Sequence, residues 1–282
     1  REESGWKLVN ADVFRPPAYM EVFCVLNGTG VQLLVSSICL ILFAAAGYLS
    51  PARRGAMVLW LVILIVSLAS AAGYTATYTY KMFKGTAWRS VLLWTALFFP
   101  TFTFTGFFLL NLLLWADGST KAIPFFSLLA VTMIWFLVSV PLAYVGGFMG
   151  YRRTPPPPPV AISKTPREIP QPQPWFLSLP VVLVSAGLLP FAAVSVEISF
   201  IYSALWLNSY YYLFGFLLLT WFILIFTVAE VSIVFCYLQL CSENYHWWWR
   251  SFFVGGSIGI YVFGYSIMFF YVQMDTVYMT AR

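Results

Sequence analysis

Seven uncharged, apolar stretches constrain this chain more than any other feature of its sequence. They cover residues 22–52, 55–80, 90–116, 122–151, 169–196, 198–229 and 251–274. The hydrocarbon core of a bilayer is about 30 Å thick and needs roughly 20 apolar helical residues to cross it, so each stretch is long enough. Only 9% of the residues are charged, against about a quarter in a soluble domain. The sequence therefore predicts an all-α, polytopic integral membrane protein with seven transmembrane helices.

Lysine and arginine fall mainly on one side of the predicted membrane, and this bias indicates orientation. With residues 1–21 in the cytosol, that side holds eleven of the fifteen basic residues: Arg1, Lys7, Arg15, Lys81, Lys84, Arg89, Arg152, Arg153, Lys164, Arg167 and Arg250. Seven crossings put the N-terminus in the cytosol and the C-terminus in the lumen, the reverse of a seven-helix receptor. Because the basic residues are scattered along the chain, the net charge of +5 predicts weak affinity for anionic membrane lipids and no nucleic-acid binding.

Proline divides the chain. The first helix is predicted to end at Ser50-Pro51, because proline cannot continue a helix. Residues 155–159 are all proline within a longer proline-rich stretch, which favours an extended spacer or a docking strip for a proline-reading domain. We therefore predict a cytosolic pre-helix segment at 1–21, a four-helix part at 22–151, a cytosolic linker at 152–178 and a three-helix part at 179–282. Without a starting methionine, the sequence is expected to be a segment of a longer protein.

Two carboxylates, Glu197 and Glu230, lie deep in the apolar part of the sequence. Ionisable residues are costly in a membrane and often functional. Measured along their helices from a short turn near Asn208, the two lie about 16 Å apart in depth, so they do not form one site. They could be stations on a proton or cation path, or protonated side chains bonded to a neighbouring helix. Asn111 is predicted to form an interhelical hydrogen bond.

Small residues recur at helical spacing in three places: Ala69, Ala72, Gly73 and Ala76; Gly146 and Gly150; and Gly255 and Gly259. Such faces let helices approach closely in membranes. They predict either packing within the protein or a groove for a cargo helix. If cargo still bound after leucine replaced Gly255 and Gly259, the groove would not lie at these residues. Trp247, Trp248 and Trp249 are predicted as anchors at the membrane interface.

Residues for catalysis are not recognisable. Cys236, Cys241 and His246 do not match the spacing of any zinc site. The sequence also has no phosphate-binding loop, no nucleophile in a known turn motif and no pair of close carboxylates. We therefore predict no enzyme, no metal and no cofactor.

Several strings resemble one family. They are GWKLV at 5–9, DVFRPP at 12–17, LSPA at 49–52 with RG at 54–55, NLL at 111–113, GS at 118–119 with AIPF at 122–125, REIP at 167–170 and, densest of all, LCSENYHWWWRSF at 240–252. In order and over nearly the whole chain, they resemble the nonaspanins, the transmembrane 9 superfamily. Two departures are Asn10-Ala11, where the family usually has His-Gly, and the five-proline run.

The resemblance implies that the seven helices are the second to eighth of nine, preceded by a lumenal domain. It also implies a resident of Golgi and endosomal membranes that sorts and delivers other membrane proteins, including those with glycine-rich membrane segments, and affects adhesion and phagocytosis. Expected partners are membrane lipids, transmembrane cargo proteins and coat proteins, the last through a C-terminal signal after Arg282. The alternatives are a proton- or cation-coupled transporter that uses Glu197 and Glu230, and a scaffold subunit of a larger membrane complex.

Overall fold

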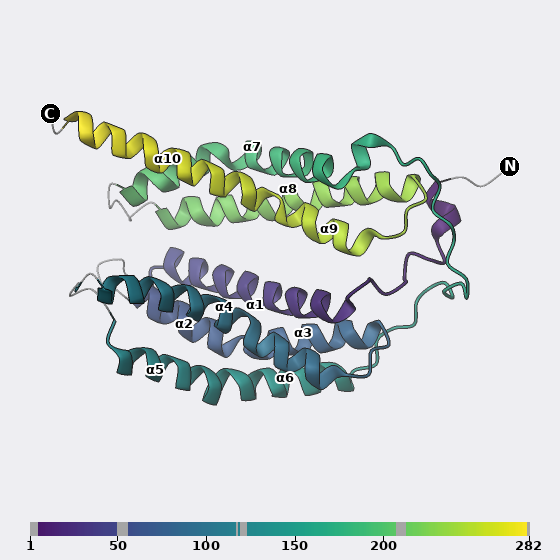
Figure 1. Ribbon diagram of the computed structural model, residues 1–282, viewed down its shortest axis with the longest axis horizontal. Coiled ribbons are helices and arrows are strands. Elements are labelled where there is room, and N and C mark those ends of the chain that lie inside the picture. The colour runs from purple at the N-terminus through teal and green to yellow at the C-terminus, as the bar shows by residue number, and fades with distance from the viewer. Residues whose placement is uncertain (1–4, 50–55, 117, 119–122, 207–212, 281–282) are drawn as a thin grey trace. The chain divides into compact units, whose positions relative to one another are not determined.

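The computed structural model describes residues 5–49, 56–116, 118, 123–206 and 213–280, and helices dominate this part of the chain (Figure 1). Within these residues, seven segments are long and apolar enough to cross a membrane: Met20–Ala45, Leu59–Met82, Trp88–Ala116, Phe125–Arg152, Leu179–Trp206, Phe214–Cys241 and Trp247–Gln273. No strand occurs among the described residues. The predicted all-α membrane architecture is confirmed, whereas its orientation stays a prediction.

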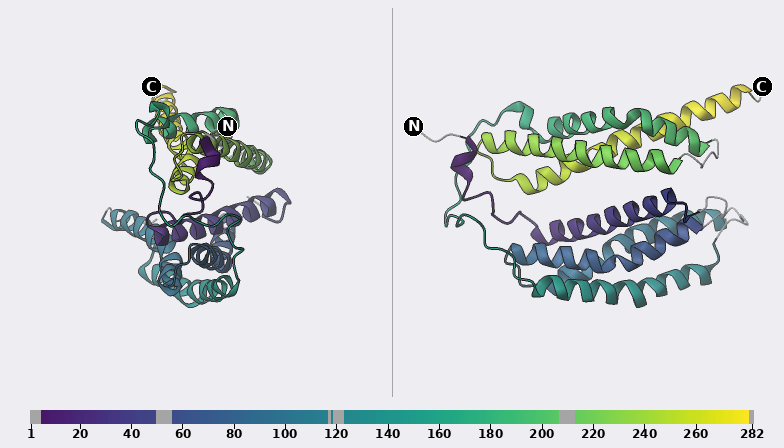
Figure 2. Two further views of the ribbon diagram at one scale, coloured as in Figure 1. Left: turned by 90° about the vertical axis from the view of Figure 1, so that its right-hand side faces the viewer. Right: turned by 180° about the vertical axis from the view of Figure 1, so that it is seen from behind.

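The chain forms two compact units. Unit 1 contains Arg1–Pro17 and Pro158–Arg282, and unit 2 contains Ala18–Pro157. We predicted the pre-helix segment and the proline-rich linker as separate parts. In the structure, residues 1–17 and most of the linker belong to the same unit as the three-helix part. Within each unit the long helices run roughly along one direction, as Figure 2 shows from two further sides.

Unit 2 is built around a central helix. Its elements are α1 (Met20–Ala45), α2 (Ala56–Ser67), α3 (Ala69–Met82), α4 (Trp88–Ala116), α5 (Phe125–Ile134), a π turn (Trp135–Ser139) and α6 (Val140–Arg152). The helix α3 packs against α1, α4 and α6. Ala69 of α3, Leu92 of α4 and Ala143 of α6 meet in a buried apolar cluster, so the small residues predicted in α3 lie at the centre of the unit.

The helix α1 ends earlier than the sequence predicted. It stops at Ala45, and Gly47 follows with a φ of +81°. The Tyr48 N–H donates to the carbonyl of Phe43 at 3.0 Å, and the Gly47 N–H donates to that of Ala44 at 3.1 Å. This pair of bonds is the Schellman arrangement that closes many helices. Glycine therefore ends the helix before Ser50-Pro51, which lies outside the described residues.

Proline shapes the span formed by α5 and α6. Pro141 has no N–H and cannot bond the carbonyl four residues earlier. The preceding residues form the π turn, in which the Val140 N–H donates to the Trp135 carbonyl. A π turn inside an α-helix adds one residue to the path. The span from Phe125 to Arg152 is therefore one helix with a single irregular turn.

Asn111 stabilises the connection before α5. It is 3% exposed. Its amide donates to the Ile123 carbonyl at 3.1 Å and accepts from the Ile123 N–H at 2.8 Å. The prediction that Asn111 bonds a neighbouring helix is wrong, because its partner Ile123 lies in the segment that precedes α5. One buried amide thus satisfies both backbone groups of a residue that has no helical partner.

In its described residues, unit 1 contains two 3-10 turns and four helices: Gly5–Val9, Trp175–Leu177, α7 (Leu179–Trp206), α8 (Leu213–Cys241), α9 (Trp247–Gly256) and α10 (Ile258–Thr280). The uncharged stretches 169–196 and 198–229 stop at Glu197 and Glu230, whereas α7 and α8 continue through these two residues, as expected for helices on either side of a turn near Asn208. The charged residues lie inside helices and do not mark their ends. Val182, Ala186 and Val254 form one buried cluster between α7 and α9.

Candidate functional site

Three segments that are distant in sequence meet at one end of unit 1. They are the residues after the first 3-10 turn, the linker residues 163–173, and the turn between α8 and α9. We call this site the junction and define it by its polar side chains: Asp12, Arg15, Arg167, Gln173, Glu243, Asn244, Trp247 and Trp248. Each of them is joined to another segment, or to a neighbour within its own turn, by a hydrogen bond or an ion pair.

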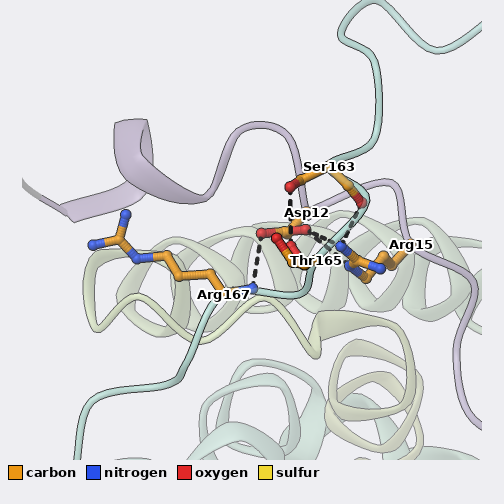
Figure 3. Close-up of polar contacts among 5 residues, drawn as sticks. All are labelled: Asp12, Arg15, Ser163, Thr165 and Arg167. Carbon is orange, nitrogen blue, oxygen red and sulfur yellow. Dashed lines mark hydrogen bonds and ion pairs between the residues drawn. The ribbon is translucent and has the colours of Figure 1, made fainter.

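Asp12 is the buried centre of the junction (Figure 3). It is 4% exposed. Its Oδ1 accepts from Arg15 Nε at 2.8 Å and lies 2.7 Å from Arg15 Nη2, while its Oδ2 accepts from the backbone N–H of Arg167 at 3.4 Å. A buried charge is tolerated only when it is paired and hydrogen-bonded. Asp12 therefore ties the N-terminal segment to the linker.

The linker is held from two further directions. Arg15 Nη2 donates to the Ser163 carbonyl at 2.7 Å. Arg167 Nη2 donates to Glu243 Oε2 at 3.0 Å, which brings in the turn after α8. Gln173 Nε2 donates to the Pro170 carbonyl at 2.7 Å and to the Ser242 carbonyl at 3.3 Å. The part of the proline-rich linker nearest α7 is therefore fastened to the folded unit.

Two of the three predicted membrane anchors bond to the N-terminal segment. Trp247 Nε1 donates to the Val13 carbonyl and Trp248 Nε1 to the Arg15 carbonyl, each at 2.9 Å. Their rings stack with centroids 4.0 Å apart. Trp247 also lines, with Trp6 and Tyr237, a groove of about 440 Å³ on α8. An anchoring role at the membrane interface stays a prediction, and the structure adds a second role within the protein.

The turn after α8 is closed by amides. Asn244 Oδ1 accepts from the His246 N–H at 3.1 Å and from Nε2 of Gln239 at 3.4 Å. Gln239 is 1% exposed. Burial lowers the pKa of His246, so the neutral imidazole is favoured in the folded junction. This arrangement can fasten segments, and it presents no nucleophile beside a base.

Glu197 and Glu230 have different surroundings. Glu197 is half-buried, and its Oε2 is enclosed without a hydrogen-bond partner in the described structure. Glu230 is exposed on α8. Along their helices, Glu197 lies about 14 Å from the end of α7 and Glu230 about 26 Å from the start of α8. Because α7 and α8 pack as consecutive antiparallel helices, the carboxylates lie at different levels of unit 1.

Gly146 and Gly150 are buried against α3. A Cβ atom on Gly146 would overlap the Ser70 carbonyl, and one on Gly150 would overlap the Tyr74 carbonyl. Thr77 Oγ1 donates to the Gly147 carbonyl at 2.9 Å across the same contact. Of the two predicted roles, these glycines have the packing role, and α3 fills the place that a cargo helix would need.

Gly255 and Gly259 lie in open surroundings. Among the described atoms, a Cβ on Gly255 would meet Val228 alone, at 3.8 Å, and one on Gly259 would meet none within 4 Å. Gly256 and Gly264 are open in the same way. Gly256, Gly259 and Gly264 lie on one side of the α9–α10 span with the exposed side chains of Ile260 and Phe263. We call these five residues the open glycine face.

Comparison with known proteins shows which family the chain belongs to. The sequence model of the family described as Endomembrane protein 70 matches residues 1–279. The chain belongs to this family. Transmembrane 9 superfamily member 10 of Arabidopsis thaliana is 43% identical over 274 residues, which are 97% of this chain and 43% of that protein. Member 2 of Rattus norvegicus is 40% identical (98% of this chain, 41% of that protein), and member 4 of Homo sapiens is 41% identical (98% and 43%).

The resemblance seen in the sequence is thereby confirmed. The chain spans less than half the length of these relatives. No solved structure matches it significantly.

Three of the strings that resemble the Endomembrane protein 70 family come together at the junction: 12–17, 167–170 and 240–252. Sequence reasoning found the strings but missed that they form one site, because more than a hundred residues separate each from the first. A signal was present, since Asp12 and Arg15 in the first string, Arg167 in the second and Glu243 in the third are complementary charges outside the apolar stretches.

Proposed function

We propose that this chain is the membrane part of a Golgi and endosomal sorting factor that assists the surface delivery of other membrane proteins, with effects on adhesion and phagocytosis. Membership of a family described as Endomembrane protein 70 supports the location. In this proposal the junction faces the cytosol, and coat proteins bind a C-terminal signal outside residues 1–282. The cargo is a protein whose membrane helix is rich in glycine.

The open glycine face supports the choice of cargo. Small residues let two helix backbones approach closely, and this contact drives helix association in lipid, where apolar side chains gain little from pairing. Gly256, Gly259 and Gly264 leave notches, and the exposed Ile260 and Phe263 rise beside them. A glycine-rich cargo helix offers the matching notches for these two side chains. Gly146 and Gly150 of α6 cannot serve, because α3 packs against them.

A delivery assay tests the proposal. Cells that lack the full-length protein receive the wild type, Gly259→Leu/Gly264→Leu, or the control Gly30→Leu/Gly106→Leu, whose glycines are equally exposed and open in unit 2. Surface levels are measured for two reporters, one with a glycine-rich and one with a leucine-rich membrane helix. We expect the first pair to fail for the glycine-rich reporter only, and the control to restore delivery.

Two outcomes would contradict parts of this proposal. Equal delivery in cells with and without the protein would exclude sorting of this cargo. Normal delivery by Gly259→Leu/Gly264→Leu would exclude the open glycine face while leaving sorting in place.

Proton- or cation-coupled transport is a second candidate, and the unpartnered Oε2 of Glu197 favours it. A carboxyl group enclosed within a membrane span is costly unless it is protonated or bound. Transport predicts a flux into proteoliposomes that is lost in Glu197→Gln. A Glu197→Gln protein that keeps both its flux and its cargo delivery would leave Glu197 with a structural role alone.

A further inference from the structure

Five basic side chains gather at one end of unit 2. Lys81 lies at the end of α3, Lys84 in the following turn, Arg89 in the first turn of α4, and Arg152 and Arg153 at the end of α6. Figure 1 shows these helix ends on the same side of the unit. The sequence predicted weak lipid affinity because its basic residues are scattered. In space these five form one cluster, which we call the basic end.

Two aromatic rings link Lys81 and Arg89 within the basic end. Lys81 Nζ donates to the Tyr151 carbonyl at 2.6 Å and lies 5.0 Å from the centre of the Tyr151 ring. That ring stacks on Trp88 with centroids 5.1 Å apart, and Arg89 lies 5.6 Å over Trp88. Such contacts hold cations beside the ring faces. They fix the positions of the charges without neutralising them.

The basic end is not balanced by acidic groups. Glu21 has the only carboxylate in the described part of unit 2, and it accepts a hydrogen bond from the Tyr80 hydroxyl at 3.3 Å. Both ion pairs recorded for the described residues belong to unit 1. Lys84, Arg89, Arg152 and Arg153 are exposed. Five positive charges against one negative charge leave this end able to bind anions.

The position of the cluster identifies the anion. The cations lie at the ends of membrane-spanning helices, with the rings of Trp88 and Tyr151 beside them, and aromatic rings are typical of headgroup depth. Positive charges at this depth face the phosphates of lipids, and guanidinium groups bind phosphate oxygens in pairs. We propose that the basic end of unit 2 binds the headgroups of anionic phospholipids. The predicted cytosolic orientation places it in the anionic leaflet.

A lipid-selection experiment tests this proposal. Full-length protein is reconstituted in nanodiscs of phosphatidylcholine with a minor fraction of phosphatidylserine, and the lipids retained by the protein on extraction are counted by mass spectrometry. Both leaflets have the same composition, so orientation does not affect the result. We expect the wild type to enrich phosphatidylserine. In Lys84→Asn/Arg89→Gln this enrichment should fall about fivefold for each cation removed.

Matched variants separate the basic end from general charge effects. Lys7→Gln/Lys164→Gln removes two exposed cations from unit 1 and should keep the enrichment. Arg89→Gln/Arg152→Gln provides an independent pair at the basic end if Lys84→Asn/Arg89→Gln does not fold. Unchanged enrichment in a folded basic-end pair, or an equal loss in the unit 1 pair, would overturn the proposal.

A competition arm separates lipid from a free anion. Inorganic phosphate and chloride are added at the same ionic strength. Equal effects of the two salts support a headgroup surface, whereas displacement by phosphate alone would show a site for small anions and would overturn the assignment to lipid.

Discussion

In unit 2, Gly146 and Gly150 of α6 touch the backbone of α3, whereas in unit 1 a Cβ on Gly256, Gly259 or Gly264 would meet no described atom within 4 Å. Both regions have glycines four residues apart in an apolar span. The difference lies in what stands opposite. Gly146 faces Ser70 of a neighbouring helix, and Gly259 faces no described atom within 4 Å. Spacing alone therefore indicates that a helix can approach, and only the fold shows whether one has done so.

The units also differ in how they join distant segments. In unit 2, α3 and α6 approach closely because Gly146 and Gly150 have no side chains at their contact. Unit 1 joins its N-terminal segment, linker and helix turn through buried polar groups around Asp12 and the tryptophans. Substitutions that add volume should therefore damage unit 2, and substitutions that remove charge should damage unit 1. Each of the following changes tests one side of that contrast.

Gly146→Leu should have the largest effect. Its Cβ would overlap the Ser70 carbonyl, so α3 and α6 must separate. We expect the free energy of unfolding to fall by about 3 kcal/mol or more, the upper range for overpacking. Thermal unfolding of the full-length protein in nanodiscs measures the loss. Gly259→Leu is the matched control and should change stability little; an equal loss in the control would erase the contrast between the units.

Arg15→Ala should have the next largest effect, and it should act on unit 1. The change leaves the Asp12 carboxylate, whose side chain is 5% exposed, without its cation. Removing one partner of a buried pair costs about 3 kcal/mol or more. Proteolysis between residues 163 and 167 should increase, because the Ser163 carbonyl loses its donor. Adding Asp12→Asn should restore part of the stability, and no restoration would contradict the role of the pair.

Acid should loosen unit 1 before unit 2. Because burial lowers the pKa of His246, folding favours the neutral imidazole. The contribution of His246 to the free energy of unfolding is complete above its pKa in the unfolded chain, about 6.5. It decreases as the pH falls below that value and levels off below the pKa of His246 in the folded protein. Proteolysis of the linker should rise with acid in the wild type. His246→Asn, compared at each pH with the same protease, should show a smaller rise; an equal rise would assign the effect to other groups.

Arg167→Ala should have the smallest effect. Its ion pair with Glu243 is partly solvated, with side chains 41% and 22% exposed. Such pairs contribute less than about 1 kcal/mol and are weakened by salt. The backbone N–H of Arg167 still bonds Asp12 in this variant. A loss comparable to that of Arg15→Ala would show that the exposed pair, and not Asp12, holds the linker.

The sequence was sufficient for features that depend on local composition. The seven apolar stretches correspond to the seven spans found in the described part of the chain, because the length of an apolar helix is a local property. Helix limits were less accurate. Gly47 ended α1 before the expected Ser50-Pro51 through backbone bonds that hydropathy does not report. The uncharged stretches also stop at Glu197 and Glu230, whereas α7 and α8 continue past them.

The sequence was insufficient where a property depends on a distant partner. Asn111 was expected to bond a helix and bonds Ile123 in a connection. Gly146 and Gly259 could not be told apart before their neighbours were placed. The junction and the basic end are both assembled from residues far apart in sequence, and for each the informative quantity is the sum of charges at one place in the fold.

The π turn at Trp135–Ser139 sets how far α6 is rotated about its axis relative to α5. One added residue corresponds to about 100° of helical rotation. The turn therefore sets which side of α6 faces α3 relative to the side that α5 buries through Leu128. Deleting one residue from this turn would leave every side chain of the glycine contact intact and still rotate Gly146 and Gly150 away from Ser70 and Tyr74. The close contact between α3 and α6 is thus controlled by the number of residues upstream of it.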